Sequence, residues 1–437
     1  MSLPARIVGL DFGTTNTVVS DLDADGEARL ASFAAPGGDA TAFRSALSFH
    51  GDDRDPTRRI VEAGPWAIET YAEEPLETRF IQSFKSYAAS PLFQETRILG
   101  RRYEFEDLLS AYLLRLRAHG AEAVPAGASC IVGRPVNFAG ARADADLALR
   151  RYGAALARMG FSEVRYVFEP VAAAFFFARK LRRDATVLVG DFGGGTSDFS
   201  IVRFERQAGR LKSTALANAG VGLAGDAFDY RIIDNLVSPA LGKGSSYRAF
   251  DNVLPIPNRY YAAFARWEQL ALLRASRDMR DIRSLLRTAL EPDKIAALVQ
   301  VLDLNQGYRL YQSVSALKET LSAQTRARFL FEAGDMRIER EVAREEFEAW
   351  IAPELAAISD AVDEAIGRSR LGADDLDRVF LTGGSSFVPA VRRLFTDRFG
   401  AERVEGGGEL VSIAAGLAYI GAEPDLDAWS QRALDAA

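Results

Sequence analysis

The feature that most constrains the fold of this chain is an internal duplication. The segment VGLDFGTTNTVVS at 8–20 returns as LVGDFGGGTSDFS at 188–200, so that Asp11 corresponds to Asp191. Each copy reads as two apolar strands joined by a glycine-containing turn, which is typical of a β-hairpin. A chain that repeats such a unit is expected to fold as two related halves.

Two further pieces recur in the same order. The strand and turn SCIVGRPVN at 129–137 has its counterpart in RVFLTGGSSFVPAVRRLF at 378–395. The alanine-rich segment EPVAAAFFFARKL at 169–181 has its counterpart in LVSIAAGLAYIG at 410–421. Three pieces in matching order predict that the whole architecture is duplicated, with one small-residue helix in each half.

Composition narrows the class of protein. The chain has 437 residues and a net charge of −7, which argues against a general binder of nucleic acid or anionic membranes. Its one cysteine, Cys130, excludes an intramolecular disulfide, fits a reducing compartment and is expected to be an inert core residue. With only His50 and His119, a zinc site or a serine–histidine triad is improbable.

The sequence also predicts a soluble, cytoplasmic protein. The N-terminal segment MSLPARIVGLDFG lacks the long apolar core of a signal peptide, because Asp11 interrupts it. The longest apolar stretch, PVAAAFFFA at 170–178, is far shorter than the roughly 20 residues that span a bilayer.

The halves are unequal in length. We expect lobe I over 1–182, with a C-terminal helix returning to it at about 410–437, and lobe II over 183–409. Apolar residues at three- and four-residue spacing between 258 and 325 indicate long amphipathic helices, and hence a helical insertion in lobe II at about 240–325. The segment 23–60, rich in Gly, Asp and Arg, indicates irregular strands and loops.

The two hairpin turns have the composition of an anion site. Glycine permits unusual φ values and lets an anion approach the main chain, so that successive N–H groups can point into one concavity. The hydroxyls of Thr14, Thr15 and Thr196 add donors without charge. A single such turn is usually only a tight turn, but a pair, with a third at Gly383–Gly384, predicts a clamp on the phosphates of a nucleotide.

A cation bound beside the phosphates would explain the acidic residues near the turns. Asp11 and Asp191 lie at strand ends, where their carboxylates would repel a phosphate unless a cation intervened. Mg²⁺ prefers oxygen ligands, keeps several waters, and typically meets one or two carboxylates plus phosphate oxygens. Asp198 and Glu169 are further candidates for holding those waters or for orienting an attacking one.

As a set, these segments resemble the Hsp70 branch of the actin-like ATPase superfamily. IVGLDFGTTNTVVS and VLVGDFGGGTSDFSIV look like its two phosphate motifs, and VFEPVAAAFF, GVGLAGDAFDYRIID and VFLTGGSSFVPAVRRLF look like further Hsp70 segments. The match runs from about residue 6 to 421 and is most similar to a nucleotide-binding module of the YegD type. The resemblance implies an α/β, RNase H-like fold with two lobes, each a mixed five-stranded sheet flanked by helices, and a cleft for ATP with Mg²⁺.

The resemblance also assigns roles to residues. Asp11, Glu169 and Asp191 would hold Mg²⁺, mostly through water, and Lys85 would stabilise charge on the transferring phosphoryl group. Asp198 and Thr196 would lie near the attacking water or the γ-phosphate. The residues that would contact the nucleotide are Gly13, Thr14, Thr15, Asn16, Gly193, Gly194, Gly195, Gly225, Asp226, Lys318, Ser322, Gly383, Gly384, Ser385 and Phe387.

Several positions depart from the family pattern. Ser315 and Glu319 replace an acid and an arginine near the base and ribose, and Phe387 replaces an arginine that stacks on adenine, although its ring can itself stack. The segment ELVSIAAG departs from the Pro-Asp-Glu-Ala pattern of the family. Only residues 422–437 follow the last core helix, so we expect no peptide-binding domain.

The prediction is a chaperone-like ATPase whose lobe closure is read by a protein partner. Two other readings stay open. One is a nucleotide sensor without turnover, or a filament-forming actin relative. The other is a kinase or phosphatase of the same superfold that acts on a sugar, acetate or polyphosphate.

Overall fold

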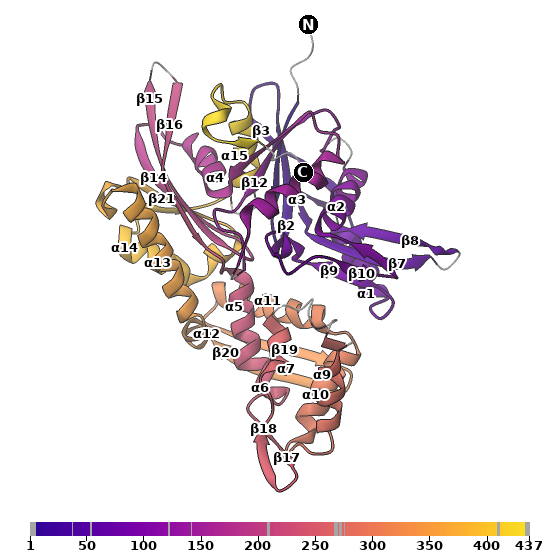
Figure 1. Cartoon of the computed structure of the whole chain (residues 1–437). Helices are drawn as coiled ribbons and strands as arrows, with labels where there is room; N and C mark the ends of the chain where they lie inside the picture. The colour runs from indigo at the N-terminus through magenta and orange to yellow at the C-terminus, as the bar shows by residue number, and fades with distance from the viewer. Residues whose placement is uncertain are drawn as a thin grey trace. The chain divides into compact units, whose positions relative to one another are not determined.

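Figure 1 shows the chain as a computed structural model. The structure describes residues 6–36, 38–52, 55–120, 123–140, 142–207, 210–265, 270, 273–274, 276–408 and 411–432. Residue 410, the first of the predicted C-terminal helix, and parts of the predicted insertion between 266 and 275 therefore lie outside the described residues.

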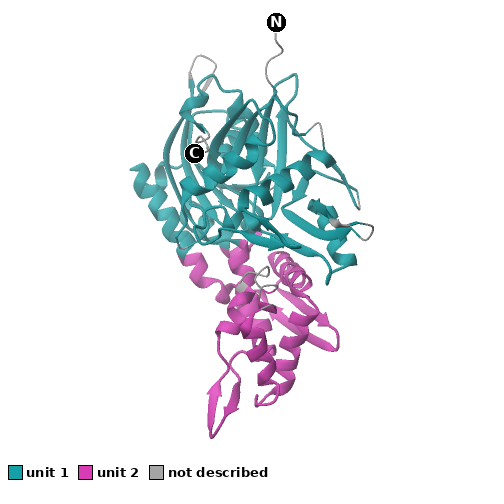
Figure 2. Ribbon diagram, turned by 45° about the vertical axis from the view of Figure 1, so that its right-hand side comes forward, with its two compact units in different colours: residues 1–224, 357–386, 391–437 teal, residues 225–356, 387–390 magenta. Residues whose placement is uncertain are grey.

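The chain divides into two compact units (Figure 2). The first contains Met1–Ala224, Ala357–Ser386 and Val391–Ala437, and the second contains Gly225–Ala356 and Phe387–Ala390. Both large sheets belong to the first unit. The boundaries predicted for lobes I and II stay a prediction.

The first sheet has the strand order β23-β13-β12-β1-β2-β3, and β6 also pairs with β2. Its strands are β1 Ile7–Phe12, β2 Asn16–Leu22, β3 Ala28–Leu30, β6 Ala42–Arg44, β12 Ser129–Arg134, β13 Glu163–Phe168 and β23 Gln431–Arg432. The sheet is mixed, since β1 pairs antiparallel with β2 and parallel with β12. Short β6 and β23 extend the predicted five strands to seven.

The second sheet repeats this plan with the order β16-β15-β14-β21-β22. Its strands are β14 Ala185–Phe192, β15 Ser197–Gln207, β16 Arg210–Val221, β21 Arg378–Thr382 and β22 Val404–Gly406. The pairing of β14, antiparallel with β15 and parallel with β21, matches that of β1 with β2 and β12. The duplication predicted from the hairpins is therefore confirmed at the level of sheet topology.

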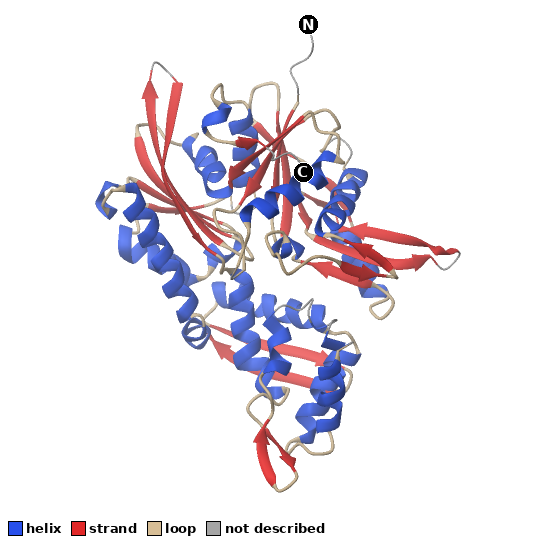
Figure 3. Cartoon of the chain, viewed as in Figure 1, coloured by secondary structure: helices blue, strands red, loops and turns tan. Residues whose placement is uncertain are grey.

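Smaller elements complete the first unit (Figure 3). The segment 23–60 forms short strands, as predicted, and contributes to small sheets beside the first one. The remaining strands are β4 Phe33–Ala35, β5 Gly38–Ala40, β7 Ala46–Asp52, β8 Asp55–Ala63, β9 Arg79–Gln82, β10 Thr96–Ile98 and β11 Arg101–Tyr103. The helices are α1 Gly64–Glu73, α2 Phe105–His119, α3 Ala145–Ala157, α4 Glu169–Ala178, α14 Pro389–Phe399, α15 Ser412–Gly421 and, shared with the second unit, α13 Ala352–Ser369. Single 3-10 turns are η1 Phe84–Tyr87, η4 Ala373–Asp375, η5 Gly384–Phe387 and η6 Leu426–Ala428.

The two sheets share a core built on α4 and α15. Apolar residues of β12, β13, β14, β15 and β21 pack together with those of the two helices. The ring of Phe177 on α4 stacks on Phe380 of β21, with centroids 4.2 Å apart. Cys130 is fully buried on β12, and burial raises the pKa of its thiol, so this cysteine is the inert core residue that the sequence predicts.

The alanine-rich helices pack at backbone contact, as their composition predicts. A side chain at Gly416 of α15 would overlap the carbonyl oxygen of Ala172 on α4. Because only hydrogen atoms fit between the two backbones, glycine is required at this crossing. The crossing fixes the two halves of the first unit against each other.

The second unit is mostly helical. Its helices are α5 Gly225–Ile232, the π-helix η2 Ile233–Val237, α6 Ser238–Ala240, α7 Arg259–Ala262, η3 Ala263–Ala265, α9 Arg277–Leu285, α10 Pro292–Asp303, α11 Gly307–Ala323 and α12 Arg344–Trp350. Its strands pair as two hairpins, β17 Ser246–Ala249 with β18 Asn252–Pro255, and β19 Arg326–Ala333 with β20 Met336–Ala343. Where described, no helix of the chain is both long and apolar enough to cross a membrane.

The predicted helical insertion differs from the structure in two respects. Residues 246–255 form a hairpin instead of a helix, consistent with Val253 and Pro255, which favour extended backbone. The expected long helices are shorter, because Pro292 begins α10 as a new helix and Gly307 begins α11.

The helix crossing yields a stability prediction. Replacing Gly416 by Ala should lower the free energy of unfolding by about 3 kcal/mol, because the added methyl forces α4 and α15 apart and overpacking outweighs the better helix propensity of alanine. Denaturant unfolding at equilibrium measures the change. The matched control is Gly367→Ala in α13, where a methyl meets nothing within 4 Å and should leave stability unchanged or slightly higher. Equal effects at both positions would contradict the close packing.

Candidate functional site

The two hairpin turns are built in the same way. The N–H of Gly13 donates to the carbonyl of Asn16 over 3.0 Å, and the N–H of Gly193 donates to that of Thr196 over 3.0 Å. The N–H groups that follow in each turn donate no hydrogen bond to any residue that the structure describes; they belong to Thr14, Thr15, Gly194 and Gly195. Both turns therefore present free backbone donors, as an anion site requires.

The two turns face each other. A Cβ placed on Gly195 would lie 3.3 Å from the hydroxyl oxygen of Thr14. The structure therefore brings together one turn from each half, whereas the binding of phosphates by these turns stays a prediction. All of these residues belong to the first unit.

Lys85 lies in the short turn η1, beside the carboxylates of the hairpins. Its ammonium donates to Glu169 Oε1 over 2.7 Å, and both side chains are at most 9% exposed. Burial would lower the pKa of Lys85, but the nearby Glu169, Tyr152 and Asp11 raise it overall, so the ammonium stays charged. The structure therefore brings together two predicted site residues that are far apart in the sequence.

The carboxylates at the two strand ends are buried and mutually repulsive. Burial and the charge of Glu169 raise the pKa of Asp11 to about 7, although Lys85 opposes the shift. Burial, Glu169, Asp11 and Asp198 raise the pKa of Asp191 well above its ordinary value. Burial and mutual repulsion therefore favour the protonated form of these carboxyls unless a cation enters the site.

Asp198 is held by backbone donors from a distant segment. Its Oδ1 accepts from the N–H groups of Val136 at 2.8 Å and Asn137 at 3.3 Å, in the turn after β12. Its Oδ2 is buried and has no hydrogen-bond partner within the described residues. Burial and Glu169 raise the pKa of this carboxyl to about 7, whereas Thr196, Asn137 and Val136 lower it.

The third glycine turn packs directly on the second hairpin. Gly383 adopts a φ of +81°, and a side chain there would overlap the carbonyl of Phe192. The hydroxyl of Ser385 donates to the carbonyl of Gly193 over 3.3 Å. Gly383–Ser385, predicted to lie on the adenosine side, therefore form one continuous surface with the second phosphate turn.

Sequence reasoning missed a serine that holds the first turn. Ser45 donates through its hydroxyl to the carbonyl of Gly13 over 2.7 Å, and its N–H donates to the carbonyl of Thr15 over 2.9 Å. Ser45 supports the first turn as Ser385 supports the second. Ser45 follows β6 and lies outside every sequence motif. Only the structure identifies it, because its hydrogen bond to Gly13 matches the one that Ser385 makes to Gly193.

The other predicted nucleotide contacts belong to the second unit. Lys318 on α11 forms an ion pair with Asp229 over 2.7 Å, and Ser315 also donates to Asp229, over 3.4 Å. The remaining predicted contacts are Gly225 and Asp226 at the start of α5, half-buried Ser322 on α11, and Phe387, which is 58% exposed. Glu319, one of the departures from the family pattern, is exposed on α11. Their roles stay predictions.

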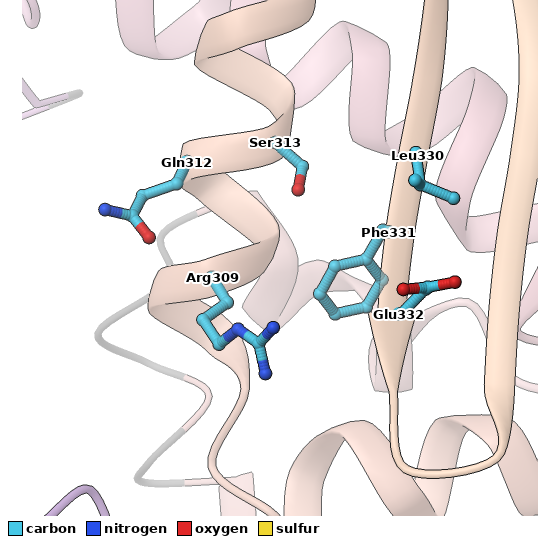
Figure 4. Close-up of a pocket in the computed structure, with 6 residues that line it drawn as sticks. All are labelled: Arg309, Gln312, Ser313, Leu330, Phe331 and Glu332. Atoms are coloured by element: carbon cyan, nitrogen blue, oxygen red, sulfur yellow. The ribbon is translucent and has the colours of Figure 1, made fainter. Parts of the chain in front are cut away.

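A cavity of ≈ 250 Å³ lies in the second unit between α11 and β19 (Figure 4). It is lined by Arg309, Gln312, Ser313, Leu330, Phe331 and Glu332. Its charged groups already have partners, since Arg309 donates to Gln306 and Glu332 pairs with Arg337. None of the predicted site residues lines it.

The donor set at the facing turns fits a hard cation held partly by water. It offers carboxylate and hydroxyl oxygens, which Mg²⁺ prefers, and a cation there would favour the ionised form of the buried carboxyls. Among the described residues, no three His, Cys, Asp or Glu side chains converge closely enough to bind one metal ion directly. An ion there would therefore need water or phosphate oxygens to complete its coordination.

Comparisons with known proteins agree on a family. A model of the Hsp70 protein family matches residues 92–245 and 299–422, more than half of the chain. Among curated relatives, chaperone protein DnaK of Deinococcus deserti is 28% identical, and that of Deinococcus radiodurans is 27% identical. Each alignment covers 95% of this chain but only 59% of the relative, so the chain spans less than two thirds of their length.

The raised pKa of Asp198 predicts a pH-dependent stability. Between the ordinary pKa of 3.8 and about 7, the folded protein keeps a proton that the unfolded chain has lost. The stabilisation of the folded state by this bound proton is complete below pH 3.8 and is lost as the pH rises through about 7. Relative to wild type, Asp198→Asn should therefore gain about 2 to 3 kcal/mol in unfolding free energy between about pH 5 and pH 8.

The measurement is denaturant unfolding in chelator, without nucleotide. Asp293→Asn, which removes an exposed carboxylate of α10, is the control and should show no such gain. A difference between wild type and Asp198→Asn that stays constant with pH would contradict the shift.

Proposed function

The chain belongs to the Hsp70 family, and from this premise we propose that it binds ATP with Mg²⁺ and hydrolyses it to ADP and phosphate. Its two mixed sheets with flanking helices are the actin-like fold of the Hsp70 nucleotide-binding region. The observation that carries the proposal is the pair of facing turns, with the buried Lys85–Glu169 pair beside them.

The turns supply what a triphosphate needs. In the proposed complex, the free N–H groups of Thr14, Thr15, Gly194 and Gly195 donate to the β- and γ-phosphate oxygens. Gly13, Asn16 and Gly193 close the turns and set the direction of these donors. Backbone donors fixed in place before the ligand arrives require little reorganisation when charge moves onto the phosphates.

Lys85 is proposed to stabilise the transferring phosphoryl group. Its ammonium gives one hydrogen bond to Glu169 and retains further donors for a phosphate oxygen. The attacking water forms a bond to the γ-phosphorus as the bond to the β-phosphate oxygen breaks, and the water loses a proton. Asp198, whose pKa is raised to about 7, is proposed either to accept that proton or to orient the water together with Thr196.

Bound Mg²⁺ would offset the charge of the phosphates, held mostly through water by Asp11, Asp191 and Glu169. The adenosine end is assigned by resemblance alone to Gly225, Asp226, Lys318 and Ser322, with the turn Gly383–Ser385. Phe387 would stack on the base. These assignments, including the choice of base, stay predictions.

The nucleotide state is proposed to be read by a protein partner. The crossing of α4 and α15 joins the two halves through small residues, and such a contact can slide in a shear motion. Closure around the phosphates would then alter a surface that a partner recognises, as expected of a chaperone-like ATPase. A cytoplasmic setting stays a prediction.

The test is binding and hydrolysis of Mg-ATP by the purified chain. Lys85→Ala should lower the rate of hydrolysis about 10²- to 10³-fold, the usual effect of removing one stabilising donor, while ATP still binds. Calorimetry measures binding, and phosphate release measures turnover. Lys294→Ala, which removes an exposed lysine of α10, is the matched control and should turn over like wild type.

Each other result has a defined meaning. Near wild-type turnover in Lys85→Ala would remove the proposed role of that lysine. Binding without turnover in the wild type would favour a nucleotide sensor. ADP release that requires an added sugar, acetate or polyphosphate would favour a kinase, and no binding of ATP would overturn the proposal.

A further inference from the structure

Arg134 is a buried cation without an anionic partner. It ends β12, is 7% exposed, and its guanidinium lies over the rings of Phe168 at 4.9 Å and Phe138 at 5.4 Å. It donates to the carbonyl of Pro135 over 3.2 Å and to Gln431 Oε1 over 3.1 Å, both uncharged acceptors. No carboxylate of the described residues forms an ion pair with it. Buried charges are ordinarily paired, so this one calls for a ligand.

A second unsatisfied group lies against the same ring. Tyr152 on α3 is 1% exposed, and its hydroxyl has no hydrogen-bond partner among the described residues. Its ring packs on Phe138 with centroids 6.1 Å apart and on Phe12 at 5.9 Å. Buried tyrosine hydroxyls normally find a partner, so the absence of one here indicates a group that the protein itself does not supply.

Both groups adjoin the phosphate turns. Arg134 pairs in register with Phe168, the residue directly before Glu169, and Phe12 directly precedes Gly13 of the first turn. Phe12 packs on Tyr152 and also on Phe84, the residue before Lys85, with ring centroids 5.9 and 5.4 Å apart. Burial raises the pKa of the Tyr152 phenol, and the charge of Lys85 opposes that shift. Arg134, Lys85 and Tyr152 are therefore all buried close to the ends of β1, β12 and β13.

We propose that Arg134, Tyr152 and Lys85 form a second oxyanion position, which holds inorganic phosphate beside the hydrolysis site. A tetrahedral oxyanion offers several acceptors to the guanidinium and the hydroxyl at once, and arginine suits such an anion by its fork of donors. The carboxylates of Glu169 and Asp198 act on Arg134 from beyond ion-pair distance and oppose an anion there. Two cations are needed to offset them, and Lys85 and Arg134 are the two present.

The proposed oxyanion position would bind the phosphate that hydrolysis releases. If the proposed hydrolysis occurs, breaking the bond to the β-phosphate frees the γ-phosphate as inorganic phosphate, and Lys85 adjoins both positions. Holding it there would retain an ADP–phosphate state before release. This part of the inference rests on the proposed function, whereas the affinity of the position for phosphate does not.

The test titrates inorganic phosphate into the nucleotide-free chain and follows thermal unfolding. Phosphate should raise the Tm of the wild type, because a ligand that binds only the folded state stabilises it. Tyr152→Phe should have an equal or higher Tm without phosphate, since it removes an unsatisfied buried hydroxyl, yet its apparent Kd for phosphate should rise about tenfold. Arg134→Gln should weaken binding about 10- to 100-fold.

Gln431→Leu is the matched control. It removes the contact of Arg134 with β23 but keeps the guanidinium, so phosphate should bind as to wild type. If Arg134 served only to anchor β23, the results would be reversed. Gln431→Leu would then have a lower Tm, and Tyr152→Phe would bind phosphate as tightly as wild type. Either that pattern or a wild type whose Tm does not respond to phosphate would overturn the inference.

Two further arms separate this inference from the proposed ATPase. The phosphate titration is repeated with Mg-ADP present. A lower Kd for phosphate when ADP is bound indicates a position for product phosphate, whereas an unchanged Kd indicates that free phosphate binds independently of nucleotide. Phosphate binding in a chain that does not bind ATP would sustain the oxyanion position and remove the ATPase. Hydrolysis without any response to phosphate would sustain the ATPase and remove the oxyanion position.

Discussion

The contact between α4 and α15 is the constraint on which the first unit depends. Each helix comes from one half of the duplicated sequence, and the two meet so closely that Gly416 lies against the backbone of Ala172. Apolar residues of both sheets pack on this pair of helices. Because the hairpins end at the same side of that shared core, the turns at Thr14 and Gly195 come to lie face to face. The facing arrangement of the two turns thus follows from a packing requirement at the centre of the fold.

The electrostatics of the site follow from the same burial. Asp11, Asp191 and Asp198 lie at the ends of buried strands, where low polarity and the charge of Glu169 raise their pKa values. Lys85 alone does not neutralise them. A site of this kind gains stability when a cation and a phosphate chain enter together, because each offsets the other and the fixed charges of the protein.

The sequence predicted the fold well and the site in part. Hairpin pairing, the matching order of the pieces in the two halves and the two small-residue helices could be read from the repeat, because each depends on local patterns of apolar residues, glycines and turns. The second unit was harder to predict. Its apolar spacing indicated long helices, but the hairpin at 246–255 and the breaks before α10 and α11 depend on a few prolines and glycines that the periodicity conceals.

The sequence by itself determined which residues can form phosphate turns, because the need for glycine and free N–H groups is a local property of the backbone. It also determined the two halves, since a repeat is visible without any structure. Only the tertiary structure decided which charges meet: Lys85 with Glu169, Asp198 with the backbone of Val136 and Asn137, and Arg134 with uncharged acceptors in the part of the chain that the structure describes. Those partners come from segments far apart in the chain, and no spacing along the sequence encodes the burial that makes their pairing matter.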